Sequence, residues 1–357
     1  MSAIPTEQKA LFLESKFGQF AVRTTEVPKP AADAVLVKIE ATALNPLDWK
    51  VQAYGVVVEV YPTILGFDGA GTVVAVGENS ETELFRIVQG WYEAAKGSVH
   101  GTFLQYFNNP ARFVATVPNS ISFDDAAAIP SGLATAAFPL YNSTGDALFS
   151  CAKLLPPWVE GGRGKYAGTP MLVLAGATSI GQFVIQLARL SGFSPIITTD
   201  SVHNASFLKS LGATHVIDRK LPAEQLTAEA TKLGGGLFPY VYDAVSLPDT
   251  LEVALALTAP KGDLVTVVST NLKELRVAHP NTDRRIHLAH GLFASPINHE
   301  IGASLLAALP GLFASGDLKP NRPEVLPGGL NGIVGGLERL KKDQVSGVKL
   351  VVRPQES

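Results

Sequence analysis

The sequence predicts a two-domain α/β protein with a β-rich domain and a parallel α/β domain. Its 357 residues exceed the size at which a single hydrophobic core stops growing. Hydrophobic residues make up 46% of the chain and charged residues 17%, as in globular proteins with a large core. Strands and helices alternate from Met171 onward, which is typical of a parallel sheet covered by helices.

The first 130 residues favour short strands, which at this spacing are typical of a barrel or sandwich. Alternating or Val-rich runs predict strands at Lys9–Leu13, Ala34–Thr42, Ile64–Gly77, Gly101–Phe107 and Arg112–Val117.

Later elements follow the same patterns. Acidic residues in a first turn predict a short helix over Phe123–Pro130, and a longer helix opens at Ser131. Residues 143–169 are rich in Gly, Pro and Ser and predict a surface loop. The remaining predicted elements are strands at Phe238–Val245, Gly262–Val268 and Val348–Val352 and a helix over Ile333–Lys341.

The most informative segment is Met171–Leu190, an apolar strand, a tight turn and an amphipathic helix. Gly176 allows the sharp turn, and Gly181 lets helix and strand approach closely. Backbone N–H groups and the helix dipole meet there and favour a dinucleotide pyrophosphate. The hydroxyls of Thr178 and Ser179 could add phosphate donors, whereas an ordinary strand-to-helix turn is the alternative. The predicted phosphate-binding residues are Gly176, Ala177, Thr178, Ser179, Ile180 and Gly181.

The next elements strengthen the nucleotide-binding interpretation. A strand over Ser194–Thr199 ends at Asp200, a helix ends at Gly212, and a strand follows at Thr214–Asp218. Strand, helix, strand, helix and strand within about fifty residues form the parallel unit that binds nucleotides at the carboxyl ends of its strands.

Composition excludes several functional classes. The net charge of −3 gives no electrostatic footprint for nucleic acid or an anionic membrane. Neither an 18-residue apolar run nor the apolar core of a signal peptide is present, so we expect a cytoplasmic enzyme. The single cysteine, Cys151, precludes an intrachain disulfide or a multi-thiolate zinc site and is interpreted as incidental. His287, His290 and His299 are interpreted as solvated or capping residues rather than metal ligands.

An ordered set of motifs covers nearly the whole chain and resembles the medium-chain dehydrogenase/reductases. The motifs are Asn45–Asp48, Gly66–Val73, Gly101–Tyr106, Ala126–Pro130, Leu211–Ala213 and Ser346–Val352. The chain is most similar to the zinc-free branch that includes quinone-oxidoreductase-like proteins and fungal trans-acting enoyl reductases. It departs from the family pattern at Phe85–Trp91, where a Gly-Asp turn is missing.

The resemblance implies a GroES-like catalytic domain, residues 1–130 and 297–357, with an inserted Rossmann doubly wound domain, residues 131–296. The cofactor would lie in the cleft between them. Zinc-dependent members have a cysteine where this chain has Asn45 and a His-Glu pair at Phe67-Asp68, so no zinc is expected.

Without a Lewis acid, hydride from a reduced nicotinamide suits a carbon conjugated to a carbonyl, with donors holding the resulting enolate. The resemblance places Asn45 and Thr135 near the nicotinamide or its ribose. Lys50 and Tyr54 follow closely enough to donate a proton or stabilise the enolate. A solvated lysine and a packing tyrosine are the alternatives.

The cofactor prediction is NADPH, with NADH as the alternative. An acid such as Asp200 normally holds ribose hydroxyls and favours NAD. The resemblance instead implies a 2′-phosphate site, matched here by Ser201 and Lys209, with Arg219 in place of a common tyrosine; Asp200 would then turn away. Further cofactor contacts are expected from Leu292, Phe293 and Lys349.

The leading functional hypothesis is an NADPH-dependent reductase of activated C=C bonds in enones, enals, quinones or enoyl thioesters. A thioester could be presented by an acyl carrier domain of a polyketide pathway. A nucleotide-binding protein without turnover is the alternative. The Val-rich and aromatic Tyr54–Tyr61 segment favours an apolar substrate. The chain could be a monomer, or a dimer paired edge to edge through Leu264–Val268.

Overall fold

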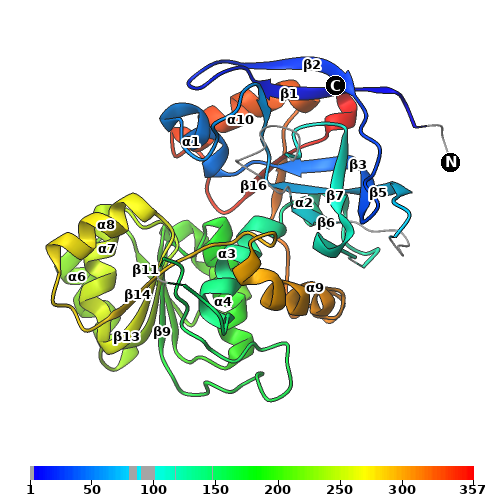
Figure 1. The fold of residues 1–357 in the computed structure, drawn as a ribbon. Helices are drawn as coiled ribbons and strands as arrows, with labels where there is room; N and C mark the ends of the chain where they lie inside the picture. The colour runs from blue at the N-terminus through cyan, green and yellow to red at the C-terminus, as the bar shows by residue number, and fades with distance from the viewer. Residues whose placement is uncertain (1–3, 80–86, 90–100, 117, 147) are drawn as a thin grey trace. The chain divides into compact units, whose positions relative to one another are not determined.

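The computed structural model describes residues 4–79, 87–89, 101–116, 118–146 and 148–357 (Figure 1). The chain divides into two compact units. The first comprises Met1–Ser131, Leu306–Ala314 and Pro320–Ser357, and the second comprises Gly132–Leu305 and Ser315–Lys319. Within the described residues, no helix is both long and apolar enough to cross a membrane.

The first unit is built on two sheets. In the larger sheet, the described strands run in the order β15-β16-β3-β5-β6-β8, and β7 also pairs with β3. Their bounds are β3 (Ala34–Ala43), β5 (Asp68–Val76), β6 (Ile87–Gln89), β7 (Tyr106–Pro110), β8 (Val114–Ala115), β15 (Pro323–Val325) and β16 (Lys349–Val352). The smaller sheet has the order β2-β1-β4, with bounds β1 (Glu7–Leu13), β2 (Phe20–Glu26) and β4 (Thr63–Ile64).

Two predicted strands of the first unit are much shorter in the structure. The strand predicted at Gly101–Phe107 begins only at Tyr106, because Phe103 donates its backbone N–H to Leu65 and Leu104 forms an isolated bridge with Ala10. The strand predicted at Arg112–Val117 shrinks to β8, because a 3-10 turn occupies Ala111–Phe113. The departure at Phe85–Trp91 lies outside the described residues except for β6.

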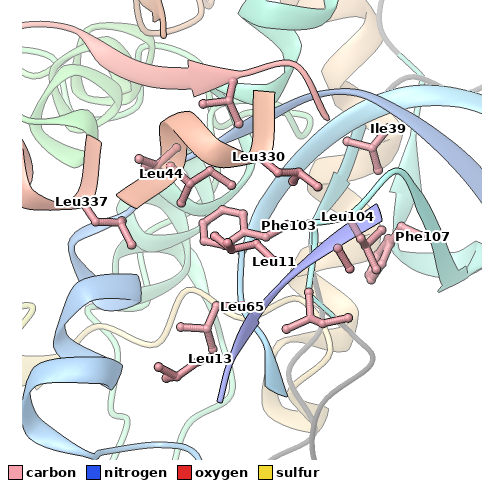
Figure 2. Close-up of a cluster of buried hydrophobic side chains, with 14 of the residues drawn as sticks. Leu11, Leu13, Ile39, Leu44, Leu65, Phe103, Leu104, Phe107, Leu330 and Leu337 are labelled. Carbon is pink, nitrogen blue, oxygen red and sulfur yellow. The ribbon is translucent and has the colours of Figure 1, made fainter. Parts of the chain in front are cut away.

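The core of the first unit gathers apolar side chains from both ends of the chain (Figure 2). Leu11 and Leu13 on β1 meet Phe103 and Leu65, while Leu337 comes from helix α10 (Gly332–Lys341). The C-terminal segment therefore completes the core that the N-terminal strands begin. The unit also contains α1 (Pro46–Tyr54), α2 (Phe123–Ala127) and the last part of α9 (His299–Ala314).

The second unit holds a parallel sheet with strand order β11-β10-β9-β12-β13-β14 (Figure 1). The strands are β9 (Met171–Leu174), β10 (Ile196–Asp200), β11 (His215–Asp218), β12 (Phe238–Asp243), β13 (Thr258–Thr266) and β14 (Arg285–Leu288). The helices are α3 (Pro130–Tyr141), α4 (Ser179–Ser191), α5 (Ala205–Leu211), α6 (Ala223–Gly234), α7 (Pro248–Leu257) and α8 (Ser269–Ala278). The order reverses beside β9, and dinucleotides bind at such a switch point, outside the carboxyl ends of the strands.

The edge-to-edge dimer predicted through Leu264–Val268 is wrong. β13 is an interior strand, because Leu264 pairs with Ile286 of β14 on one side and with Val241 of β12 on the other. The edge strands of the described sheet are β11 and β14.

The 143–169 insert forms no helix or strand in its described part, as predicted, but it is not a loose surface loop. The Tyr166 ring stacks on Phe193 with centroids 5.1 Å apart, and its backbone N–H donates to the carbonyl of Ser191. Trp158 packs edge-on against Tyr141 and donates from Nε1 to Ser304 Oγ at 3.1 Å. Aromatic packing thus fixes a segment whose composition predicted a surface loop.

Candidate functional site

In the turn after β9, glycine is required at Gly176 and Gly181 because a side chain would not fit there, and not because the backbone needs a conformation that only glycine adopts. The left-handed residue of the turn is Ala175, with φ of 60°. A Cβ on Gly176 would lie 2.2 Å from Thr198 Oγ1, and a Cβ on Gly181 would lie 2.4 Å from the carbonyl oxygen of Ala175. The close approach predicted for Gly181 is confirmed, whereas Gly176 is required for packing against β10.

The first turn of α4 is capped from within. Thr178 Oγ1 accepts from the N–H of Gly181 at 3.0 Å and donates to the carbonyl of Ala175 at 2.8 Å. Its hydroxyl proton is therefore committed, which corrects the expectation that it serves as a phosphate donor. Helix geometry leaves the N–H of Ile180 without an intrahelical acceptor, so the backbone keeps the character of an anion site. Phosphate contacts of Ser179 and Ile180 stay predictions, whereas the N–H of Ala177 already donates to Asp200 at 2.7 Å.

Asp200 at the end of β10 is occupied by protein donors. Its carboxylate accepts from the N–H of Ala177 at 2.7 Å, from the N–H of Ser201 at 2.8 Å and from Asn204 Nδ2 at 2.8 Å. The residue is 7% exposed. Asp200 thus ties the glycine turn to the next loop, and both of its oxygens are engaged by this chain.

Two of the three residues predicted to hold a 2′-phosphate, Ser201 and Arg219, lie beside Asp200. Ser201 follows Asp200 directly and is half-buried. Arg219 follows β11, is exposed, and donates its backbone N–H to the carbonyl of Asp200 at 3.0 Å. Lys209 is exposed in the last turn of α5. A joint contact with phosphate stays a prediction.

Thr135 on α3 lies against the loop that follows β14. A Cβ on Gly291 would be 2.2 Å from Thr135 Oγ1, and Tyr242 Oη donates to the carbonyl of Thr135 at 2.6 Å. Leu292 of the same loop is half-buried. Phe293 is 3% exposed and packs edge-on against Phe138, so its side chain belongs to the core, and its predicted cofactor contact stays a prediction.

A buried charged network occupies the first unit. Lys349 Nζ lies 3.1 Å from Asp68 Oδ2 and donates to Asn45 Oδ1 at 2.6 Å, while Asn45 Nδ2 donates to Asp68 Oδ2 at 2.8 Å. Asp68 Oδ1 accepts from the backbone N–H of Ser131 at 2.7 Å. The side chains of Lys349 and Asp68 are 4% and 0% exposed. Cofactor binding by Lys349 and a catalytic contact of Asn45 stay predictions beside these internal roles.

Two acids of this region were not predicted as site residues. Asp68 begins the apolar strand β5, and an acid in a Val-rich buried strand was the available signal. Asp48 is wholly buried, accepting from the N–H of Asn45 at 2.7 Å and of Gly66 at 3.2 Å. Burial, outweighing these hydrogen bonds, raises the pKa of Asp48 to about 7.

Lys50 and Tyr54, predicted as proton donors, flank the same indole on α1. Lys50 Nζ lies 5.8 Å from the Trp49 ring centroid, and the Tyr54 ring meets Trp49 edge-on at 5.6 Å. Burial lowers the pKa of Lys50 from its ordinary value. Tyr54 is 60% exposed, so it is not a packing residue of the core. Their catalytic roles stay predictions.

The donors present do not suit a catalytic zinc ion. At the positions where zinc-dependent members carry ligands, this chain offers an amide from Asn45 and a carboxylate from Asp68 that the Lys349 ammonium already neutralises. Zinc prefers thiolate, imidazole and unpaired carboxylate. The described residues contain no group of three or more His, Cys, Asp or Glu side chains suited to a metal.

Two family models match the two units. The alcohol dehydrogenase GroES-like domain matches residues 31–119, and the zinc-binding dehydrogenase model matches residues 179–298. Among solved structures, an alcohol dehydrogenase superfamily protein from Novosphingobium aromaticivorans is 25% identical with a TM-score of 0.75, covering 97% of this chain and 99% of that one. A quinone oxidoreductase from Pseudomonas syringae shares the fold at 22% identity and a TM-score of 0.76, covering 97% of this chain and 100% of that one.

Curated relatives extend along the whole chain. The trans-enoyl reductase opdC of Penicillium oxalicum is 30% identical over 373 residues, 98% of each chain. The trans-enoyl reductase traG of Penicillium crustosum is 28% identical over 368 residues, 98% of this chain and 97% of the relative. The fold, the switch point of its parallel sheet and the similarity to these relatives together identify the chain as an NAD(P)-binding oxidoreductase. The chain belongs to the medium-chain dehydrogenase/reductase family.

Proposed function

We propose that this chain is an NADPH-dependent, zinc-independent reductase of the C=C bond of α,β-unsaturated thioesters, which a polyketide synthase presents on an acyl carrier domain. The full-length similarity to proteins named trans-enoyl reductases carries the proposal. The donor set at Asn45 and Asp68 supports it, because a site without a Lewis acid suits hydride addition to a conjugated carbon.

The residues around β10 support NADPH rather than NADH as the cofactor. Asp200 is engaged by three protein donors, so its oxygens are not free to hold the ribose hydroxyls, the contact that favours NAD. The exposed Lys209 and Arg219 would supply the positive charge, and Ser201 a hydroxyl. The pyrophosphate would be held by the amides at the start of α4. Bound NADPH would supply the hydride to the β-carbon of the substrate.

The chain's own residues then have distinct tasks. Thr135 and Leu292 would position the nicotinamide half beside the loop after β14. Lys50 and Tyr54 are the candidates to deliver the proton to the α-carbon. Lys50 is favoured for that task, because its lowered pKa eases proton release.

The deciding experiment compares two acceptors under identical conditions, a crotonyl pantetheine thioester and cyclohex-2-enone. Oxidation of NADPH is followed by the absorbance of the reduced nicotinamide. We expect kcat/KM to be at least about tenfold higher for the thioester, because the proposed site uses binding energy from the pantetheine arm.

A preference for the enone would instead place the chain among reductases of free small molecules. If neither acceptor supports NADPH oxidation while the protein still binds NADPH in a fluorescence titration, the chain is a nucleotide-binding protein without turnover. If an acyl carrier domain presents the natural substrate, a crotonyl group attached to that domain should be reduced with a still higher kcat/KM.

A further inference from the structure

His290 occupies the carboxyl edge of the second half of the parallel sheet. It lies two residues beyond Leu288, where β14 ends, and next to Gly291, which packs against Thr135. In a doubly wound sheet, each half binds one mononucleotide of a dinucleotide at this edge. The glycine turn and Asp200 belong to the β9–β11 half, which leaves the β12–β14 half for the nicotinamide nucleotide.

The loop that carries His290 is held rigidly. Asn298, which is 2% exposed, donates from Nδ2 to the carbonyl of His290 at 2.8 Å and to that of Leu292 at 2.9 Å. Asn142 in turn donates to Asn298 Oδ1 at 3.1 Å. A side chain on this loop therefore has a defined position, as a residue that contacts reacting atoms requires.

A second anchored segment covers one face of the His290 imidazole. Phe149 stacks on that ring with centroids 4.2 Å apart and an interplanar angle of 23°. Its neighbour Ser150 hydrogen-bonds His287 Nδ1 at 2.9 Å, and His287 Nε2 hydrogen-bonds the buried Asp263 at 2.8 Å. The chain Asp263, His287 and Ser150 ties the 143–169 insert to β14 and so fixes Phe149 against His290.

The polar edge of the ring is uncommitted. Within the parts of the chain that the structure describes, neither ring nitrogen of His290 has a hydrogen-bond partner. The ring is half-buried, and burial lowers the pKa of His290 despite the opposing charge of Asp146. At neutral pH the imidazole is thus uncharged and still offers one N–H.

We propose that the His290 imidazole donates a hydrogen bond to the carbonyl oxygen of the substrate thioester and stabilises the enolate that forms there. This inference rests on the proposed function. Hydride forms the new C–H bond at the β-carbon, the C=C π pair moves to the α-carbon and carbonyl, and a proton then adds to the α-carbon. His290 keeps its own proton throughout, so it acts as a preorganised donor in a partly water-excluded position. Phe149, which stacks on the imidazole, fixes the orientation of that ring.

The test uses His290→Phe, which keeps a ring to stack on Phe149 but has no donor, and His290→Gln, which keeps an N–H. His215→Phe is the matched control, because His215 is exposed at the amino end of β11. We expect kcat for crotonyl pantetheine to fall about 100-fold in His290→Phe, to recover partly in His290→Gln and to be unchanged in the control. The Kd for NADPH should stay within about twofold in all three.

An infrared measurement on the protein with NADP⁺, which cannot turn over, provides a readout besides activity. The thioester carbonyl band of bound crotonyl pantetheine should shift to lower frequency in the wild type and return toward its solution position in His290→Phe. A wild-type band at the solution position would overturn the role of His290, even if the Phe variant failed to fold.

The outcomes separate the two proposals. Full kcat in a folded His290→Phe protein, with an active wild type, overturns the inference and leaves the reductase function standing. A wild type that binds NADPH but reduces no unsaturated thioester overturns the reductase function and the inference with it.

Discussion

Two polar regions of this protein contrast sharply. In the first unit, Asn45, Asp68 and Lys349 satisfy one another, and the charged side chains are almost fully buried. In the second unit, Lys209 and Arg219 are exposed, and the His290 ring nitrogens have no partner within the described residues. Both regions contain charged and hydrogen-bonding side chains of the kinds that catalysis and ligand binding use.

The contrast shows that a polar residue in a family motif need not be poised for chemistry. A buried ammonium and carboxylate must pair, because leaving either unpaired in a low-dielectric interior costs several kcal/mol. Groups at the sheet edge retain hydration and can exchange water for a ligand. We therefore expect substitutions in the first region to act mainly on stability and substitutions in the second to act mainly on binding and turnover.

The largest expected effect is on the buried network. Lys349→Met should lower the free energy of unfolding by about 3–5 kcal/mol, because the Asp68 carboxylate loses its counter-charge in a buried site. Urea unfolding followed by circular dichroism measures this change. Lys341→Met, at an exposed lysine of α10, is the control and should stay within about 0.5 kcal/mol. Equal effects of the two substitutions would contradict the structural role of Lys349.

An intermediate effect is expected from Asp48. Its pKa is raised from 3.8 to about 7 on folding, so the native state binds more protons than the unfolded state between these values. Stability should therefore fall as pH rises through this window, by about 2.6 kcal/mol between about pH 5 and about pH 8. Asp48→Asn cannot ionise and should lose this part of the slope. Parallel pH profiles of unfolding free energy for the two proteins would show that Asp48 does not titrate there.

The smallest expected effect is on cofactor binding by the exposed Lys209. Lys209→Ala should raise the Kd for NADPH about tenfold and leave that for NADH within about twofold, because only NADPH carries the 2′-phosphate. Fluorescence titration of the reduced cofactors measures both. Lys232→Ala, an exposed lysine of α6, is the matched control. Equal weakening of both cofactors by Lys209→Ala would remove its phosphate role.

Local chemistry determined much of the fold in advance. The alternation of apolar and polar residues predicted β3, and the glycine turn with its amphipathic helix predicted β9 and α4. Asp200 was found at the end of β10, as the strand pattern indicates. These features depend on side-chain periodicity and backbone constraints that act within a few residues.

Only the tertiary structure decided which polar groups are committed. The partners of Asp68 come from Asn45 and from Lys349, which lies 304 residues beyond Asn45. Likewise, β13 became an interior strand because β14 folds beside it, and Phe149 met His290 because His287 and Asp263 anchor the insert. Sequence patterns record what each residue can do, but burial and pairing are set by contacts between distant segments, and these contacts separate a scaffold charge from one that can serve a ligand.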